Sequence, residues 1–237
     1  MELAGLWRYP VKSLRGEALE SADLTTDGVA GDRTVHVAGA RGPLSGRTRY
    51  GLLTIPATTG PGGVPHVAGH PWDSVAAAAI VREHAGADAQ LVAYDGPERF
   101  DVGNLLVATD GAVERFGHDL RRLRPNLLIG GVEVDAEPAW AGKALAVGDA
   151  LVGIHSVRDR CVVTTIDPDS GTQDLDVLRR IRDEFDGQLA VNAWVIRPGP
   201  VRVGDPVELV ESDAEAAHLG GWIAGAPYEL HAAPAGP

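Results

Sequence analysis

The apolar positions of this chain fall mostly into short runs that suit β-strands, separated by turns rich in glycine and proline. Residues 1–55 contain several such runs, and Pro10 is expected to interrupt the first of them. Residues 56–72 are rich in proline and glycine and show no hydrophobic period, so we predict an irregular loop there.

The strand signal strengthens in the second half of the chain. The run 143–157 predicts two strands joined by a Gly-Asp turn, and the run 201–210 repeats that pattern around a second Gly-Asp turn. The runs 161–166 and 190–196 are continuous apolar segments, which are typical of strands in a buried sheet or barrel.

Three segments predict helices. One begins with Asp73 or Ser74 as its N-cap and ends near residue 84, and a second begins at Thr109 and Asp110 and reaches about His118. The third, over 174–187, has the clearest helical pattern and ends at a glycine. Its apolar stripe is formed by Leu175, Leu178, Ile181 and Phe185.

These elements predict a mainly β fold of the α+β type, with a few peripheral helices. We expect one β module over residues 1–75, a connecting helical segment over 76–120, and a second β module over 121–211. The end of the chain is rich in alanine, glycine and proline, which predicts a loosely ordered tail over 212–237.

The net charge of the chain limits the kinds of molecule that it can bind non-specifically. The net charge is −12 over 237 residues, which argues against non-specific binding to nucleic acid or to an anionic membrane. A site for an anion therefore needs a local cluster of arginine and lysine.

The single cysteine excludes an intrachain disulfide and fits a reducing compartment. The N-terminal segment lacks the features of a signal peptide, and no window approaches the length of a membrane-spanning apolar run. We therefore expect a cytoplasmic protein.

Cys161 is the first candidate for chemistry. A lone intracellular cysteine is most often a small buried apolar residue. Here Arg158, Asp159 and Arg160 directly precede it, and cationic neighbours favour the thiolate, which is the metal-binding and nucleophilic form. We predict that these charged residues place Cys161 at the start of a strand, where a site can open.

Other chemistry finds weaker support. His66 and His70 are four residues apart but lack the further ligands of a zinc site, and His155 fits an ordinary strand histidine. A Cys-His nucleophile stays possible, since its partner can be distant in sequence. The run 167–176 fails as a calcium loop, because its glycine falls at the fifth position and no glutamate follows at the twelfth.

Basic clusters recur along this acidic chain. Arginine and lysine with neighbouring hydroxyl and backbone N–H groups bind phosphate well, so an anionic cofactor held between two modules would explain the clusters. They lie at Lys12–Arg15, Gly31–Arg33, Arg47–Arg49 and Arg121–Asn126.

Seven motifs, in order along the chain, resemble those of one protein family. YPVKSLRGE (9–17), DGVAGDR (27–33) and LSGR (44–47) resemble the β-barrel module that precedes MOSC domains. Residues 124–131, 140–149, 160–171 and 196–210 resemble the MOSC domain itself, with RCVVTTIDPDSG followed by VGDPV as the most specific part. The similarity is strongest to the amidoxime-reducing components and their bacterial counterparts, and it implies an N-terminal β-barrel-like module followed by a MOSC β-barrel.

The resemblance also implies a molybdenum cofactor, a molybdopterin with a terminal phosphate, bound at Cys161. Cys161 would be both the metal ligand and the catalytic residue. The residues implied to contact the cofactor are Lys12, Ser13, Arg33, Arg47, Thr109, Asp110, Arg124, Asn126 and Arg160, with Arg160 also a candidate to orient the substrate.

The implied reaction is a two-electron reduction of N-hydroxylated compounds, which needs no pyridoxal phosphate. Some bacterial relatives carry an iron–sulfur domain, but no cysteine follows Cys161 here, so the electrons must come from a separate donor protein of the iron–sulfur, flavin or heme type. Asn192 stands where some relatives have an aromatic residue. The alternative function is a carrier of the cofactor, or of sulfur bound to Cys161, and a cofactor-free structural protein is the third possibility.

Overall fold

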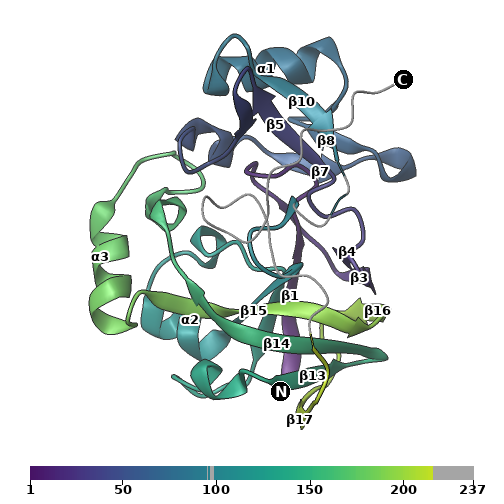
Figure 1. The fold of residues 1–237 in the computed structure, drawn as a ribbon, viewed down its shortest axis with the longest axis vertical. Coiled ribbons are helices and arrows are strands. Elements are labelled where there is room, and N and C mark those ends of the chain that lie inside the picture. Colours follow the sequence, from purple (N-terminus) through teal and green to yellow (C-terminus); the bar gives the residue numbers. More distant parts are fainter. Residues whose placement is uncertain (95, 97–98, 216–237) are drawn as a thin grey trace.

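Short strands make up most of the computed structural model, which describes residues 1–94, 96 and 99–215, and three α-helices lie around them (Figure 1). The predicted mainly β fold with a few peripheral helices is confirmed. No helix among the described residues is both long and apolar enough to cross a membrane.

An eight-stranded sheet forms the larger part of the fold, in the order β17-β13-β14-β15-β11-β12-β1-β2. Neighbouring strands are antiparallel except β11 and β12, which run parallel. The strands are β1 (Glu2–Arg8), β2 (Glu17–Ala18), β11 (Leu105–Thr109), β12 (Leu127–Gly130), β13 (Lys143–Val147), β14 (Ala150–Asp159), β15 (Gln188–Arg197) and β17 (Val207–Glu211).

This sheet curls until its two ends meet. The backbone N–H of Leu3 in β1 donates to the carbonyl of Asp205 at 2.9 Å, and that of Gly204 donates to Leu3 at 2.8 Å, just before β17 begins. The curled sheet encloses a core of aliphatic side chains, among them Leu6, Leu145 and Ile154, each at most 1% exposed. Burial of these side chains is the main term that favours this fold.

A second module lies above the sheet in Figure 1. It consists of the sheet β10-β5-β6, the sheet β7-β8-β9 and helix α1, which pack around the buried Val11, Val37, Leu52 and Val81. The bounds are β5 (Val35–Gly39), β6 (Gly42–Leu44), η1 (Tyr50–Thr54), β7 (Ala57–Thr59), η2 (Pro61–Gly63), β8 (Pro65–Val67), β9 (His70–Pro71), α1 (Val75–Ala85) and β10 (Gln90–Ala93).

The loop predicted over 56–72 is therefore wrong, because β7, β8 and β9 occupy much of it. Ala57 and Val67 are paired across β7 and β8 and are fully buried against the core of the second module. Strands of two or three residues are too short to show an alternating pattern, which is why the segment resembles a loop in sequence.

A third small sheet joins distant parts of the chain. Strand β3 (Ser21–Thr25) pairs with β4 (Gly28–Val29) on one side and with β16 (Gly199–Arg202) on the other. The two strands around the second Gly-Asp turn thus belong to different sheets, since β16 pairs with β3 and β17 with β13.

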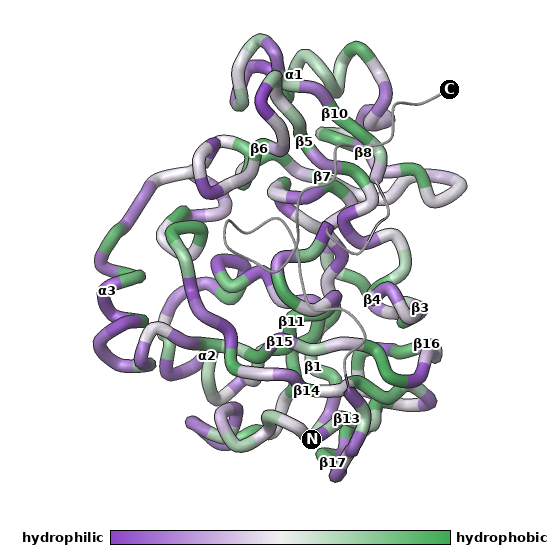
Figure 2. The backbone as a smooth tube through the Cα atoms, viewed as in Figure 1, coloured by the Kyte–Doolittle hydropathy of each residue, from purple (hydrophilic) through white to green (hydrophobic). Residues whose placement is uncertain are grey.

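The predicted helices are present, with one error in the third. Ser74 caps α1, and Thr109 caps α2 (Asp110–Phe116). Helix α3 (Leu175–Glu184) buries Val177 and Ile181, whereas Leu175, predicted to lie on the apolar stripe, is half exposed. Figure 2 shows how hydrophilic most of α3 is. The remaining one-turn helices are η4 (Leu120–Arg122), η5 (Glu137–Trp140) and η6 (Val162–Thr165).

The predicted strand over 161–166 is wrong, because η6 occupies it. The hydroxyls of Thr164 and Thr165 donate to the carbonyls of Cys161 and Val162, three residues back in each case. Such local bonds favour a tight turn over a strand ladder. Cys161 therefore follows the end of β14 and does not start a strand.

The division of the chain at residues 75 and 120 stays a prediction. Strand β1 comes from the first predicted segment but lies in the large sheet, between β12 and β2. Residues 212–215 have no regular structure, and the rest of the predicted tail, 216–237, lies outside the described residues.

A buried carboxylate joins two neighbouring strands of the large sheet. Glu137, in η5, accepts hydrogen bonds from the backbone N–H of Thr109 in β11 and of Ala190 in β15, both at 2.9 Å. Ala190 has a φ of +67°, a conformation that costs a residue with a side chain about 1 kcal/mol. Burial raises the pKa of Glu137 to about 7, against the opposing effect of the bonds from Thr109 and Ala190.

We predict that Glu137→Gln changes the pH dependence of stability. A raised pKa of an acid means that its contribution is present below the unfolded-state value, about 4, and is lost as the pH rises through 7. When the pH rises from 5 to 8, ionisation of Glu137 should thus lower the free energy of unfolding of the parent protein by roughly 2–3 kcal/mol. The variant should lack this change, because glutamine does not titrate. Urea unfolding of both proteins at the two pH values gives the comparison. An equal difference between variant and parent at both pH values would contradict the assignment.

Candidate functional site

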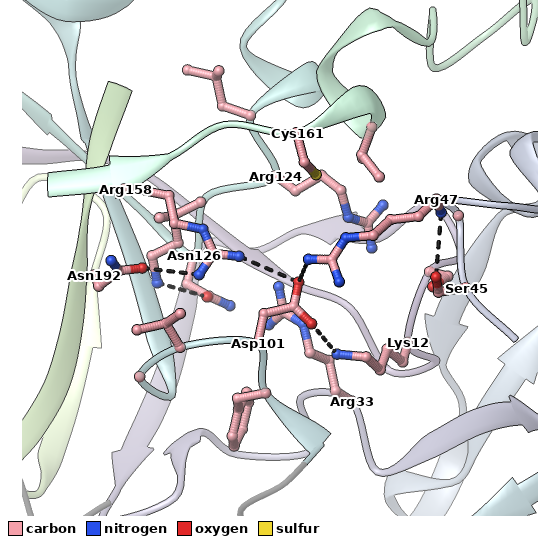
Figure 3. A pocket seen from close by; sticks show the side chains of 18 of the residues that line it. Lys12, Arg33, Ser45, Arg47, Asp101, Arg124, Asn126, Arg158, Cys161 and Asn192 are labelled. Carbon is pink, nitrogen blue, oxygen red and sulfur yellow. Dashed lines mark hydrogen bonds and ion pairs between the residues drawn. The ribbon is translucent and has the colours of Figure 1, made fainter. Parts of the chain in front are cut away.

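A pocket opens between the large sheet and the second module, and most of its polar side chains are charged (Figure 3). Eight of the ten site residues predicted from the sequence line it, although they come from five separate stretches of chain. These eight are Lys12, Ser13, Arg33, Arg47, Arg124, Asn126, Arg160 and Cys161.

Three of these residues have a strained backbone. Ser13, Arg33 and Arg124 have φ values of +72°, +55° and +58°, in the left-handed region that residues with side chains rarely adopt. Strain of this kind gathers at functional sites, where it holds a side chain in a required direction.

Asp101 lies at the centre of the pocket and binds three cations. Its Oδ1 is 2.8 Å from Lys12 Nζ, and its Oδ2 is 2.9 Å from Arg47 Nη2 and 3.2 Å from Arg158 Nη2. Burial alone would raise the pKa of Asp101, but Lys12, Arg47 and Arg158 outweigh it and hold this pKa far below its usual range. The carboxylate is therefore ionised throughout the physiological range.

A hydrogen bond to Asn192 holds the side chain of Arg158 in place. Its Nη1 donates to Asn192 Oδ1 at 3.0 Å, and the Asn192 amide nitrogen donates to Ser156 Oγ and to the carbonyl of Val157. Because both ends of the Asn192 amide have partners, its orientation is fixed, and it holds Arg158 toward Asp101.

The side chain of Cys161 reaches the same group of residues. The cysteine is half-buried, and in Figure 3 its sulfur lies near Arg124 and Arg47. Burial would lower the pKa of Arg47, but Asp101 and the side chain of Cys161 together raise it. Arg47 thus connects the carboxylate of Asp101 to the thiol of Cys161.

Two half-buried arginines in the pocket have no acidic partner among the described residues. Arg124 donates from Nη2 to the carbonyl of Leu14 at 2.7 Å and stacks on the ring of Tyr9 at 4.3 Å. Arg160 donates from Nη2 to the carbonyl of Leu123, and its buried Nε has no acceptor. Burial lowers the pKa of each guanidinium to about 10.

The charge balance of the pocket points to an anionic ligand. Its lining contains six cationic side chains and two carboxylates, those of Asp101 and Asp159. A buried charge without a partner is costly, so an excess of buried cations is retained where a ligand completes the balance. A ligand with a phosphate fits this arrangement, since guanidinium groups bind phosphate through paired hydrogen bonds. The half-buried thiol beside them can supply a soft metal ligand.

Two predicted residues lie elsewhere. Thr109 is fully buried and caps α2 by accepting from the N–H of Ala112. Asp110 accepts from the backbone N–H groups of Gly131 and Val132 and fixes the loop after β12. Both side chains stabilise local structure, and neither lines the pocket.

Asn126 lines the pocket, but its amide is already bonded. Its Oδ1 accepts from the N–H of Leu106, and its Nδ2 donates to Asp32 Oδ2 and to the carbonyl of Trp7. Asn126 therefore joins β1, β11 and the Asp32 turn beneath the pocket.

Three residues of the ion-pair network in the pocket, Asp101, Arg158 and Asn192, were not among the predicted site residues. Asp101 lies four residues before the start of β11. The available signal was a carboxylate near an apolar run, in a chain whose basic clusters need a counter-charge. Nothing in the sequence pairs Arg158 with Asn192, because their contact depends on the register of β14 against β15.

The fold and pocket together define a β-barrel protein with a cationic pocket beside a cysteine. The chain belongs to the MOSC family: the model of the MOSC domain matches residues 82–208, and that of the MOSC N-terminal beta barrel domain matches residues 1–57. The predicted family is thereby confirmed.

Curated relatives match part of the chain. It is 31% identical to mitochondrial amidoxime-reducing component 1 of Mus musculus and 33% identical to that of Homo sapiens, each over 129 positions. Each match covers 46% of this chain, and 37% and 38% of the respective relative. Among solved structures, the YUAD protein of Bacillus subtilis is similar over 90% of this chain and 96% of its own, with 14% identity and a TM-score of 0.46.

We predict that Asp101→Asn destabilises the protein, because three cations lose their shared partner. At pH 7 and low salt the free energy of unfolding should fall by roughly 2 kcal/mol. Because the pKa of Asp101 is depressed, its carboxylate stabilises the folded protein at pH values above the unfolded-state pKa, about 4, and this stabilisation is lost as the pH falls below that value. The difference in stability between the variant and the parent protein should therefore be smaller at pH 3.

Inorganic phosphate provides the control for this variant. If the three cations face a ligand site, added phosphate should stabilise Asp101→Asn more than the parent protein, since the anion replaces the missing charge. Unfolding followed at several phosphate concentrations and constant ionic strength measures this. An equal response of both proteins would mean that the cations do not face a ligand site.

Proposed function

We propose that this protein is a molybdenum-cofactor-dependent reductase of N-hydroxylated compounds. The observation that carries the proposal is the side chain of Cys161, in a pocket whose cations exceed its carboxylates by four, six against two. Membership of the MOSC family and the similarity to proteins named amidoxime-reducing components support it.

The pocket residues divide into one that can bind the metal and several that can bind the pterin and its phosphate. Cys161 would bind molybdenum through its sulfur. Lys12, Ser13, Arg33 and Arg124 would bind the pterin and its phosphate, since together they offer cationic and hydroxyl donors to the pocket. Arg160 offers a buried Nε without an acceptor and would donate to the same ligand.

In the overall reaction, an N–OH group takes up two electrons and two protons and gives N–H and water. A molybdenum centre, when bound, supplies the change of oxidation state that this N–O cleavage requires. The chain supplies ligation, orientation and electrostatics.

Asp101 is suited to orient the substrate. Its ionised carboxylate accepts hydrogen bonds, and Arg47, which binds it, also interacts with the side chain of Cys161. A substrate hydroxyl that donates to Asp101 would thus lie close to the sulfur that holds the metal. Lys12 Nζ, bonded to the same carboxylate, has a pKa lowered by burial and can give up a proton more readily than an exposed lysine.

The electron donor would be a separate iron–sulfur, flavin or heme protein. The chain contains a single cysteine, which the proposal assigns to molybdenum, and an iron–sulfur cluster is held by several thiolates. A cytoplasmic location stays an expectation.

The test is to produce the protein in cells that make the cofactor and to measure molybdenum and pterin per chain. We expect close to one of each, and turnover of benzamidoxime to benzamidine with a chemical reductant. A fully loaded protein that turns over no N-hydroxylated substrate would refute the reductase. Ready transfer of its cofactor to an apo-enzyme would then support the carrier alternative.

Cys161→Ser separates ligation from pterin binding. Serine supplies no thiolate, so turnover should fall at least a hundredfold and the absorption that comes from the bond between the metal and the Cys161 sulfur should disappear, while pterin content stays comparable. Ser170→Ala, a change in the exposed turn after η6, is the matched control. Retained turnover and absorption in Cys161→Ser would exclude the ligand role.

A further inference from the structure

A second pocket lies next to the first and shares a wall with it. It has a volume of about 190 Å³, and Leu53, Arg124 and Val163 line both pockets. Four arginines line the second pocket, Arg15, Arg121, Arg122 and Arg124, and its described lining contains no carboxylate. Neither the family match nor the proposed reaction assigns it a role.

The arginines of the pocket already bind three carboxylates of the chain: Arg121 binds Asp119 and Asp169, Arg15 binds Asp169, and Arg122 binds Asp167. Asp169, on the turn after η6, accepts from Arg15 Nη1 at 2.9 Å and from Arg121 Nη1 and Nη2 at 2.9 and 2.6 Å. Its side chain is 59% exposed, so little burial holds it there. The two guanidinium groups are therefore arranged to hold a carboxylate, and Asp169 takes the place that a ligand's carboxylate would occupy.

Two of the arginines in this pocket have N–H groups that can still donate to a ligand. Within the described part of the chain, Arg15 donates only from Nη1, and Arg124 donates only from Nη2. The other nitrogens of these two guanidinium groups can donate to a ligand, since every N–H of arginine is a donor. Arg122, by contrast, donates from both terminal nitrogens, to Asp167 and to the carbonyl of Thr164.

The rest of the lining is apolar and includes two flat rings, those of Trp7 and Tyr9, with Ile166 and Pro168. Tyr9 is a neutral ring at physiological pH, because burial raises its pKa to about 12, and its hydroxyl donates to the carbonyl of Pro125. The guanidinium groups of Arg124 and Arg33 already lie over the Tyr9 ring, at 4.3 and 4.9 Å, so a flat apolar ligand would lie against Trp7, Ile166 and Pro168.

We propose that the second pocket binds a small planar organic anion of the aromatic carboxylate type. The arginines at its edge recognise the carboxylate, and the aromatic lining takes the ring. Arg124 is shared with the first pocket, but the carboxylate-binding groups Arg15 and Arg121 are not, so changes at those two residues test this site separately from the proposed reductase activity.

The probe is benzoate, with benzamide as its uncharged counterpart of nearly equal shape. Titration calorimetry on the full chain at low, constant ionic strength should show saturable binding of benzoate, at least tenfold tighter than that of benzamide, since the charge-assisted bonds are lost. Equal affinity for both compounds, or no binding of benzoate at millimolar concentration, would overturn the proposal.

Two variants should change benzoate affinity in opposite directions. The double variant Arg15→Gln/Arg121→Gln should weaken it about tenfold or more, because both carboxylate-binding groups are lost. Asp169→Asn should strengthen it several-fold, because the competing carboxylate is removed while the arginines stay. Arg179→Gln, at an exposed ion pair on α3, is the control and should leave the affinity unchanged.

Folding of each variant is checked by its unfolding transition, so that a weak binder is not simply an unfolded one. The opposite signs make the test specific, since a general loss of structure cannot tighten binding. Asp169→Asn binding benzoate no more tightly than the parent protein, or the double variant binding it unchanged, would place the anion outside this pocket.

Discussion

The shared ion pairs of Asp101 are the interaction on which the rest of the site depends. Lys12, Arg47 and Arg158 come from three separate stretches of chain and would repel one another without a common counter-charge. One carboxylate draws them together, and the Asn192 amide fixes the last of them against β15. The cationic pocket therefore exists as a fixed arrangement before any ligand is present.

Burial of charge and backbone strain both make this pocket energetically costly. Arg124 and Arg160 are half-buried with carbonyl partners only, and their pKa values fall to about 10 because burial disfavours the charge. Backbone strain at Ser13, Arg33 and Arg124 adds to this cost. The closed aliphatic core of the large sheet supplies the stability that makes such a site tolerable.

Arg124 is part of the lining of both pockets. It stacks on Tyr9 and bonds to the backbone of Leu14. With Leu53 and Val163 it forms the wall between the cysteine-containing pocket and the arginine pocket beside it. Both pockets are cationic in an acidic protein. Local clusters, and not the overall charge, thus determine what this surface can bind.

The sequence by itself determined the strand content, the helix caps at Ser74 and Thr109, and most of the cationic residues of the pocket, because apolar periodicity, capping and charge clusters are local signals. It misplaced Cys161 at a strand start, since the β-branched run after it resembles a strand while threonine hydroxyls fold it into a turn. Only the tertiary structure decided that Asp101 joins the cations, that Arg158 meets Asn192, and that Thr109 and Asp110 lie outside the pocket. Those contacts depend on strand register and on the packing of distant segments, which no local pattern encodes.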